Sequence, residues 1–316
     1  MTLFEGVRAV ASASGDSLVD WNAVRDAATA GTPPGDLTLT AAEREAYAGD
    51  VRDARERIRE VSTLDFDVPD TVSVMNRHHW IDANVDTFER VFRPLNDPTV
   101  ALPGVSRTLN TGGAAAALSF LARNVLGQYD PLLLGGDDAH ELYFVHPNIV
   151  DAAASLDVPL ARFRRWIAFH EVTHAAEFGA APWLTDYLED RLRAGVIELE
   201  DEYRLDTDEF EDVMLAMTAV EGYAELLMDR AFDRKYDDLR RKLDARRRGG
   251  GPVTKLFRRL LGLGLKRQQY EQGREFFDAI VDARDMETAS LVWAAPENLP
   301  RSDELETPGR WLARVA

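Results

Sequence analysis

Two histidines and a glutamate occur at a spacing that suits a metal ion. His170, Glu171 and His174 form the pattern H-E-x-x-H. Residues four apart share a helix face, so both imidazoles can bind one zinc ion with the glutamate beside the activated water. With 6 His and 55 acidic residues in 316 positions, chance gives roughly 0.02 such matches, even counting Asp as Glu. We therefore favour a zinc site over a pair of hydrogen-bonded core histidines.

A catalytic zinc also needs a third protein ligand and an open position for water. The Gly and His of the metzincin extension are absent, because Glu177 and Ala180 occupy those positions. Glu177 lies one turn after His174, but three ligands from one straight helix would crowd one side of the metal. The third ligand is therefore expected on another helix.

Glu221 is the candidate that we favour for this ligand. It begins the block Glu221-Gly222-Tyr223-Ala224-Glu225, whose small residues would let the helix approach the histidine helix closely. Two alternatives stay open. Glu225, one turn later on the same face, could be a ligand or support one, and both glutamates could belong to an ordinary solvated acidic face.

The other four histidines are weaker candidates. His78 and His79 are adjacent and cannot face the same way on a helix, so at most one of them could bind the metal. His140 and His146 lie near a region with strand character and stay outside candidates.

This set of residues suits metal-assisted hydrolysis of a peptide or another amide. Zinc held by His170, His174 and Glu221 would lower the pKa of its water toward about 7. Glu171 would take the proton during attack on the carbonyl and deliver it to the leaving amine. A tyrosine or histidine would suit the oxyanion, but the sequence does not rank the tyrosine candidates, which are Tyr129, Tyr187, Tyr203 and Tyr223.

Helices must position most of these groups. We expect one helix to be capped by Asp157 and to run through the histidines to Phe178, and a second to span about 208–234. Further helices are expected at about 40–60, with no strong apolar face, at 76–95, and at 111–126, opened by Gly112-Gly113.

The β structure is expected to be small. Residues 131–134 and 142–145 form two short apolar runs around a Gly- and Asp-rich turn, which predicts an antiparallel hairpin. The strand at 142–145 could bind substrate by β-addition. In the competing interpretation of the preceding segment, Gly127 ends a helix and Tyr129 packs in the core.

Composition excludes several classes of protein. The chain has no Cys, so disulfide scaffolds, thiolate metal sites and cysteine nucleophiles are excluded. Its formal net charge of -18 argues against binding to nucleic acid. The Asp-rich, Lys-poor composition suggests a high-salt cytoplasm. No secretion signal or membrane span is expected, and the predicted localisation is cytoplasmic.

Several blocks resemble the zincin-like metallopeptidase family of actinobacteria and archaea, in the same order along the chain. The resemblance extends from about residue 21 to 314 and rests on the histidine motif and the segments 77–84, 125–130, 144–148, 221–225, 266–270 and 293–311. The resemblance implies that His170, His174 and Glu221 are metal ligands and that Glu171 is the general base. It also implies peptidase activity, which is the activity predicted for the family. One branch of the family is associated with biosynthesis of the deazaflavin coenzyme.

Residues 240–267 hold eleven basic residues and a Gly-Gly-Gly-Pro loop, which departs from the resemblance. We expect an exposed helix-loop-helix whose arginines pair with acidic surface residues, with binding of an acidic partner, RNA or a membrane surface as the alternative.

The resulting prediction is one zincin-like domain over 1–316, mainly α with a small antiparallel β element. It comprises an N-terminal helical layer (1–70), helices plus hairpin (71–150), metal-site helices (151–235) and a basic loop with C-terminal helices (236–316). We predict a Zn²⁺-dependent hydrolase acting on a peptide or protein. The alternatives are a zinc protein without peptidase activity and a non-proteolytic accessory protein for the deazaflavin coenzyme.

Overall fold

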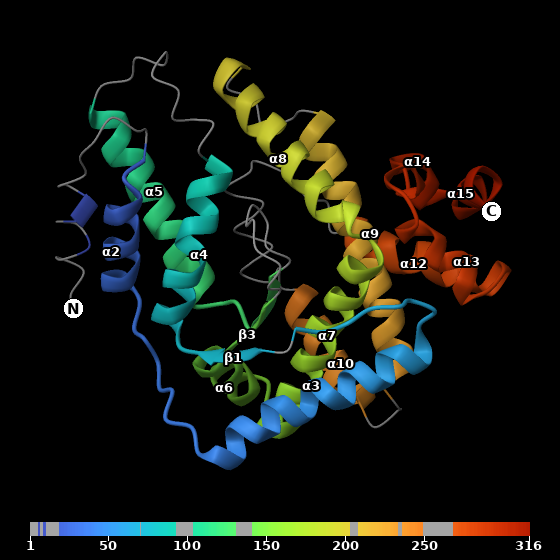
Figure 1. Ribbon diagram of the computed structural model, residues 1–316, viewed down its shortest axis with the longest axis horizontal. Helices are drawn as coiled ribbons and strands as arrows, with labels where there is room; N and C mark the ends of the chain where they lie inside the picture. Colours follow the sequence, from blue (N-terminus) through green and yellow to red (C-terminus); the bar gives the residue numbers. More distant parts are fainter. Residues whose placement is uncertain are drawn as a thin grey trace.

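Helices dominate the computed structural model, which describes residues 6, 9–10, 19–69, 71–92, 104–130, 141–202, 208–232, 236–248 and 268–316 (Figure 1). In chain order the elements are α2 (Trp21–Gly31), α3 (Ala41–Val61), β1 (Val72–Met75), α4 (Arg77–Phe92), α5 (Gly104–Ala122), β2 (Gly127–Asp130), β3 (Glu141–Val145), α6 (His146–Ser155), α7 (Leu160–Ala180), α8 (Trp183–Glu202), α9 (Asp208–Ala231), α10 (Asp237–Arg248), α12 (Gln268–Ala283), α13 (Met286–Ser290), η3 (Leu291–Trp293), η4 (Pro296–Asn298), α14 (Ser302–Glu306) and α15 (Pro308–Val315). The predicted fold class is confirmed. Across these ranges, no helix is both long and apolar enough to cross a membrane.

The small sheet has three strands within the described residues, in the order β1-β3-β2. β3 is parallel to β1 and antiparallel to β2, so the sheet is mixed. The predicted strand at 142–145 is present as β3, whereas 131–134 lies outside the described residues. Because β3 has a neighbour on both sides, the prediction that it offers a free edge for substrate is wrong. Of the strands that the structure describes, β2 lies at the edge next to α7.

The alternation of side chains along β3 places the sheet between two hydrophobic clusters. Leu142 and Phe144 belong to the larger cluster, whereas Tyr143 and Val145 belong to the smaller one. Successive residues of a strand point to opposite faces, so one strand contributes to both. The smaller cluster joins the sheet to α2, α4 and α5, on one side of the molecule in Figure 1.

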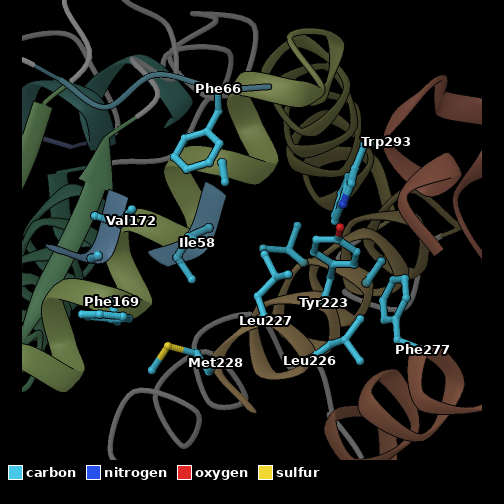
Figure 2. Packing of buried hydrophobic residues seen from close by; sticks show 14 of the residues in the cluster. Ile58, Phe66, Phe169, Val172, Tyr223, Leu226, Leu227, Met228, Phe277 and Trp293 are labelled. Carbon is cyan, nitrogen blue, oxygen red and sulfur yellow. The ribbon is translucent and has the colours of Figure 1, made fainter. Parts of the chain in front are cut away.

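The larger cluster surrounds α7, which carries the histidine motif. Phe169 and Val172 of α7 lie near Ile58 of α3 (Figure 2). Nearly every side of α7 carries buried residues, as expected for a helix in the centre of a core. Its N-cap is Pro159, and Asp157 has φ 52° and does not cap it. The predicted cap is therefore wrong, because the chain turns at Asp157 before the helix begins.

α3 packs along α7, although its sequence was expected to lack a strong apolar face. Its buried residues recur three or four positions apart, which makes one narrow stripe on a polar helix: Tyr47, Val51, Ala54 and Ile58. A capping box between Thr40 and Glu43 begins the helix. Only these four of its 21 residues are buried, which explains why the apolar pattern is weak.

α5 and α9 test two further helix predictions. α5 begins at Gly104, so Gly112 and Gly113 lie inside the helix and do not open it. α9 runs from Asp208 to Ala231, close to the predicted 208–234.

The predicted basic helix-loop-helix is described only in part. α10 covers its first residues, and 249–267 lie outside the described residues. Arg240 forms an ion pair with Asp229, and Lys242 donates to the backbone carbonyl of Asp157 at 2.7 Å. The division of the chain into four segments stays a prediction.

Candidate metal centre

α7 and α9 bring the three predicted ligands together. His170, His174 and Glu221 are half-buried, and one nitrogen or oxygen atom from each lies within 4.8 Å of the other two. The Nε2 atoms of the two histidines are 3.2 Å apart. Zinc–nitrogen bonds of about 2.0–2.1 Å in tetrahedral geometry place neighbouring ligands about 3.3 Å apart. The donor set and its spacing therefore fit a zinc ion.

Glu177 lies behind the histidine pair and orients one of its rings. This glutamate is completely buried, and its Oε2 lies 2.8 Å from Nδ1 of His174. A proton on Nδ1 donates to the carboxylate and leaves Nε2 with its lone pair on the side of His170, as in many carboxylate–histidine–zinc arrangements. The sequence suggests Glu177 only as a third metal ligand, one that would crowd the same side of the ion as the two histidines. Its spacing of three residues from His174 was the signal for this hydrogen bond, because such residues are neighbours on a helix.

Glu171 is buried and contacts strand β2. Its Oε2 accepts a hydrogen bond of 3.0 Å from the backbone N–H of Tyr129. Gly127 lies against the same side chain, since a Cβ at this position would come within 2.7 Å of Cγ and Oε1 of Glu171. Gly127 and Tyr129 lie in β2, so the interpretation in which Gly127 ends a helix is wrong, whereas its expectation that Tyr129 packs against the core is confirmed.

Burial and neighbouring charges shift the protonation of these groups. Burial raises the pKa of Glu171 to about 7 and that of Glu177 to about 7. Burial by itself lowers the pKa of His174, but its hydrogen bond to Glu177 and the charges of Glu177, Glu221 and Glu171 raise it to about 9. Three carboxylates thus share one partly desolvated region with the imidazoles. Such a field favours a bound cation.

Close helix packing holds α9 at the position from which Glu221 reaches the histidines, but the packing differs from the prediction. Gly222 faces Gly273 of α12, where an added Cβ would lie 2.4 Å from the backbone carbonyl carbon. A Cβ on Gly273 would in turn lie 2.4 Å from the carbonyl oxygen of Thr218. The expectation that Gly222 faces the histidine helix is therefore wrong. It allows α12, a helix that no sequence pattern connects with the site, to pack against α9.

The remaining candidates lie outside the group of three. Glu225 is half-buried on α9 and does not belong to it. His78 Nε2 is 2.7 Å from the carbonyl oxygen of Thr32, His146 Nδ1 is 2.9 Å from the hydroxyl of Tyr47, and His79 is exposed. His140 lies outside the described residues.

The tyrosine candidates for the oxyanion also separate. Tyr223 is fully buried, and its hydroxyl is 2.9 Å from Ser290 Oγ. In Figure 2 its ring lies beside Trp293 and Phe277. Tyr187 packs against Trp183 and lies under Arg191, Tyr129 packs against Phe178, and Tyr203 lies outside the described residues. The oxyanion role stays unassigned.

Comparison with known proteins agrees with this geometry. The model of a family described as zincin-like metallopeptidases matches residues 19–214 and 194–312. A solved structure from Chloroflexus aurantiacus, described as a "putative hydrolase with a novel fold", is similar with a TM-score of 0.79 and 34% identity, over 94% of this chain and 98% of that one. No curated protein matches the chain. Since the two family matches together include β2, α7, α9 and α12, the chain belongs to the zincin-like metallopeptidase family.

Proposed function

We propose that the chain is a zinc-dependent hydrolase, and specifically an intracellular metallopeptidase. His170, His174 and Glu221 would hold the zinc, and Glu171 would serve as general base. The observation that carries the proposal is the convergence of the three ligand atoms within 4.8 Å. Membership of a metallopeptidase family and similarity to a protein described as a putative hydrolase support it.

Each side chain of the site has a separate task in this proposal. Zinc, when bound, would supply Lewis acidity and lower the pKa of a water molecule toward about 7. Glu171 would accept the proton of the attacking water and return it to the leaving amine. Glu177 would keep His174 Nε2 directed to the metal through its 2.8 Å contact with Nδ1. These tasks require no movement of the histidines, because their Nε2 atoms are already at the spacing of neighbouring ligands.

Glu171 is suited to act as the general base and is not suited to act as a fourth zinc ligand. Its Oε2 is hydrogen-bonded to the N–H of Tyr129, and the group of three ligand atoms does not include it. A catalytic zinc site keeps one position open for water. The carboxylate beside that position would therefore be free to exchange protons.

The test is hydrolysis of a quenched fluorogenic peptide library by zinc-loaded protein purified in high salt. We expect cleavage by the native chain and a loss of about 100-fold or more for Glu171→Gln, with zinc content retained. Equal cleavage by both proteins would refute the role of Glu171 and point to a contaminating protease. If the native chain holds zinc but leaves every peptide intact, the peptidase proposal fails.

That last result would favour the alternative of an accessory protein for deazaflavin coenzyme biosynthesis. The two functions separate on one further measurement, which is binding of the deazaflavin coenzyme itself to the native chain. Under the peptidase proposal, we expect no coenzyme binding that depends on His170, His174 or Glu221.

A further inference from the structure

We propose that strand β2 fixes the orientation of the general base, with the N–H of Tyr129 holding one carboxylate oxygen of Glu171 and Gly127 leaving the space that the other needs. This inference rests on the proposed function. It makes Gly127 a positioning residue, since it would act through Glu171 and not on the substrate.

The register of the sheet determines which backbone group reaches Glu171. Val145 N–H donates to Leu126 C=O at 2.9 Å, so Leu126 and Val145 form a hydrogen-bonded pair. Along an antiparallel ladder such pairs alternate with pairs whose backbone groups point away from the partner. Tyr129, opposite Leu142, is of the second kind, so its N–H points away from β3 and toward α7. A shift of one residue in register would turn this N–H away from the carboxylate.

The close contact with Glu171 also explains why residue 127 is a glycine. Among the described residues, the glycine with a positive φ is Gly35, so the backbone of Gly127 does not itself demand glycine. A Cβ there would lie 2.7 Å from Cγ, 2.7 Å from Oε1 and 2.8 Å from Cδ of Glu171. The obstruction therefore includes the middle of the side chain as well as its end. Glycine within a strand often marks such a close approach of another group.

These two contacts restrict the carboxylate from the strand side. The hydrogen bond fixes Oε2, and Cγ and Oε1 occupy the space that a Cβ on residue 127 would need. Because α7 fixes the backbone of Glu171 through its buried neighbours, the side chain is held at both ends. A displacement of about 1 Å in a catalytic group can cost about 100-fold in rate. An added methyl group at residue 127 would force a displacement of that size.

The first experiment measures the hydrogen bond directly, without any substrate. Amide hydrogen exchange of Tyr129 is followed by NMR in the zinc-loaded full chain, for the native protein, Glu171→Gln and Glu171→Ala. We expect exchange at least about 10-fold faster in Glu171→Ala, and near-native exchange in Glu171→Gln, because the amide carbonyl still accepts a hydrogen bond. The same exchange rate in all three proteins would overturn the proposal.

The second experiment compares Gly127→Ala with Gly113→Ala. Gly113 is an exposed helical glycine, and a Cβ there would meet nothing within 4 Å. We expect both variants to keep one zinc per chain, but peptide-library cleavage to fall about 100-fold in Gly127→Ala alone. Undiminished cleavage by Gly127→Ala would overturn the proposal. If the native chain cleaves no peptide, the proposed function fails, whereas the exchange of Tyr129 still decides whether β2 holds Glu171.

Discussion

Gly127 lies against Glu171, and Gly222 follows Glu221 in the chain; these two glycines meet different kinds of neighbour. At Gly127, on the strand side, the space that a Cβ would fill is occupied by the side chain of Glu171. At Gly222, on the helix side, it is occupied by the backbone of Gly273 on α12. A side chain can rotate away at the cost of its function, whereas two packed helices must separate.

The difference indicates how the strand side and the helix side each position a glutamate of the site. The strand side positions a group through one hydrogen bond and one close contact, so its failure should appear mainly in catalysis. The helix side positions Glu221 through backbone packing of α9 on α12, so its failure should appear in stability and in metal binding together.

The largest expected effect is therefore at Gly222. In Gly222→Ala the new methyl group would overlap the backbone of Gly273, and overpacking of this kind costs about 1–3 kcal/mol. We expect a loss near the upper end of that range in urea unfolding, with weaker zinc binding. Gly113→Ala is the control and should be neutral or more stable by up to about 1 kcal/mol. A greater loss of stability in Gly127→Ala than in Gly222→Ala would reverse the comparison.

A smaller effect is expected when the support of His174 is weakened. Glu177→Gln keeps the shape of the side chain but removes its charge, and changes in such partners typically cost 10- to 100-fold in metal affinity. We expect about a 10-fold weaker zinc affinity by competition with a chelator.

Glu304→Gln is the matched control for this variant, because Glu304 is also a buried carboxylate but pairs with Arg314 at 2.6 Å, outside the site. That variant should be destabilised with an unchanged zinc affinity. Equal zinc affinities of the Glu177→Gln and native proteins would show that Glu177 contributes only to the core.

The smallest expected effect is a loss of folding stability at low pH, caused by protonation of His146 at the end of β3. His146 directly follows β3, and burial lowers its pKa, although the charges of Glu43 and Asp36 oppose the shift. The unfolded chain would therefore bind a proton near pH 6.5 that the folded chain resists, so this group should reduce stability as the pH falls below about 6.5. We expect the urea midpoint of His146→Gln to rise relative to that of the native protein as the pH falls below about 6.5, whereas the exposed control His79→Gln should follow the native protein. The same pH dependence in all three proteins would contradict the assignment.

The sequence was sufficient for the parts of the site that depend on local spacing. His170 and His174 are one turn apart on one helix, so their approach follows from helix geometry, and α7 was predicted almost to its ends. The mainly helical fold follows in the same way from apolar periodicity along α4, α7 and α9. The placement of Glu221 near the histidines came from the block around it and from the family resemblance.

The sequence was not sufficient where distant segments meet. Tyr129 and Glu171 are 42 residues apart, and no spacing rule connects a strand N–H with a helical carboxylate. The close contact of Gly222 was expected, but its partner on α12 depends on tertiary packing that the pattern of one helix does not contain. Asp157 resembled an N-cap because Asp is common there, yet its positive φ places it in the turn before α7.

The most direct test of the proposed metal centre is the zinc content of the native chain, Glu221→Ala and Glu225→Ala, measured by elemental analysis after purification in high salt. The two glutamates lie one turn apart on α9 and are both half-buried, so the pair controls for the loss of a carboxylate. We predict one zinc per chain in the native protein and in Glu225→Ala, and loss of zinc in Glu221→Ala. A native chain that takes up no zinc when zinc is supplied, or a Glu221→Ala protein that keeps it, would contradict the proposed ligand set.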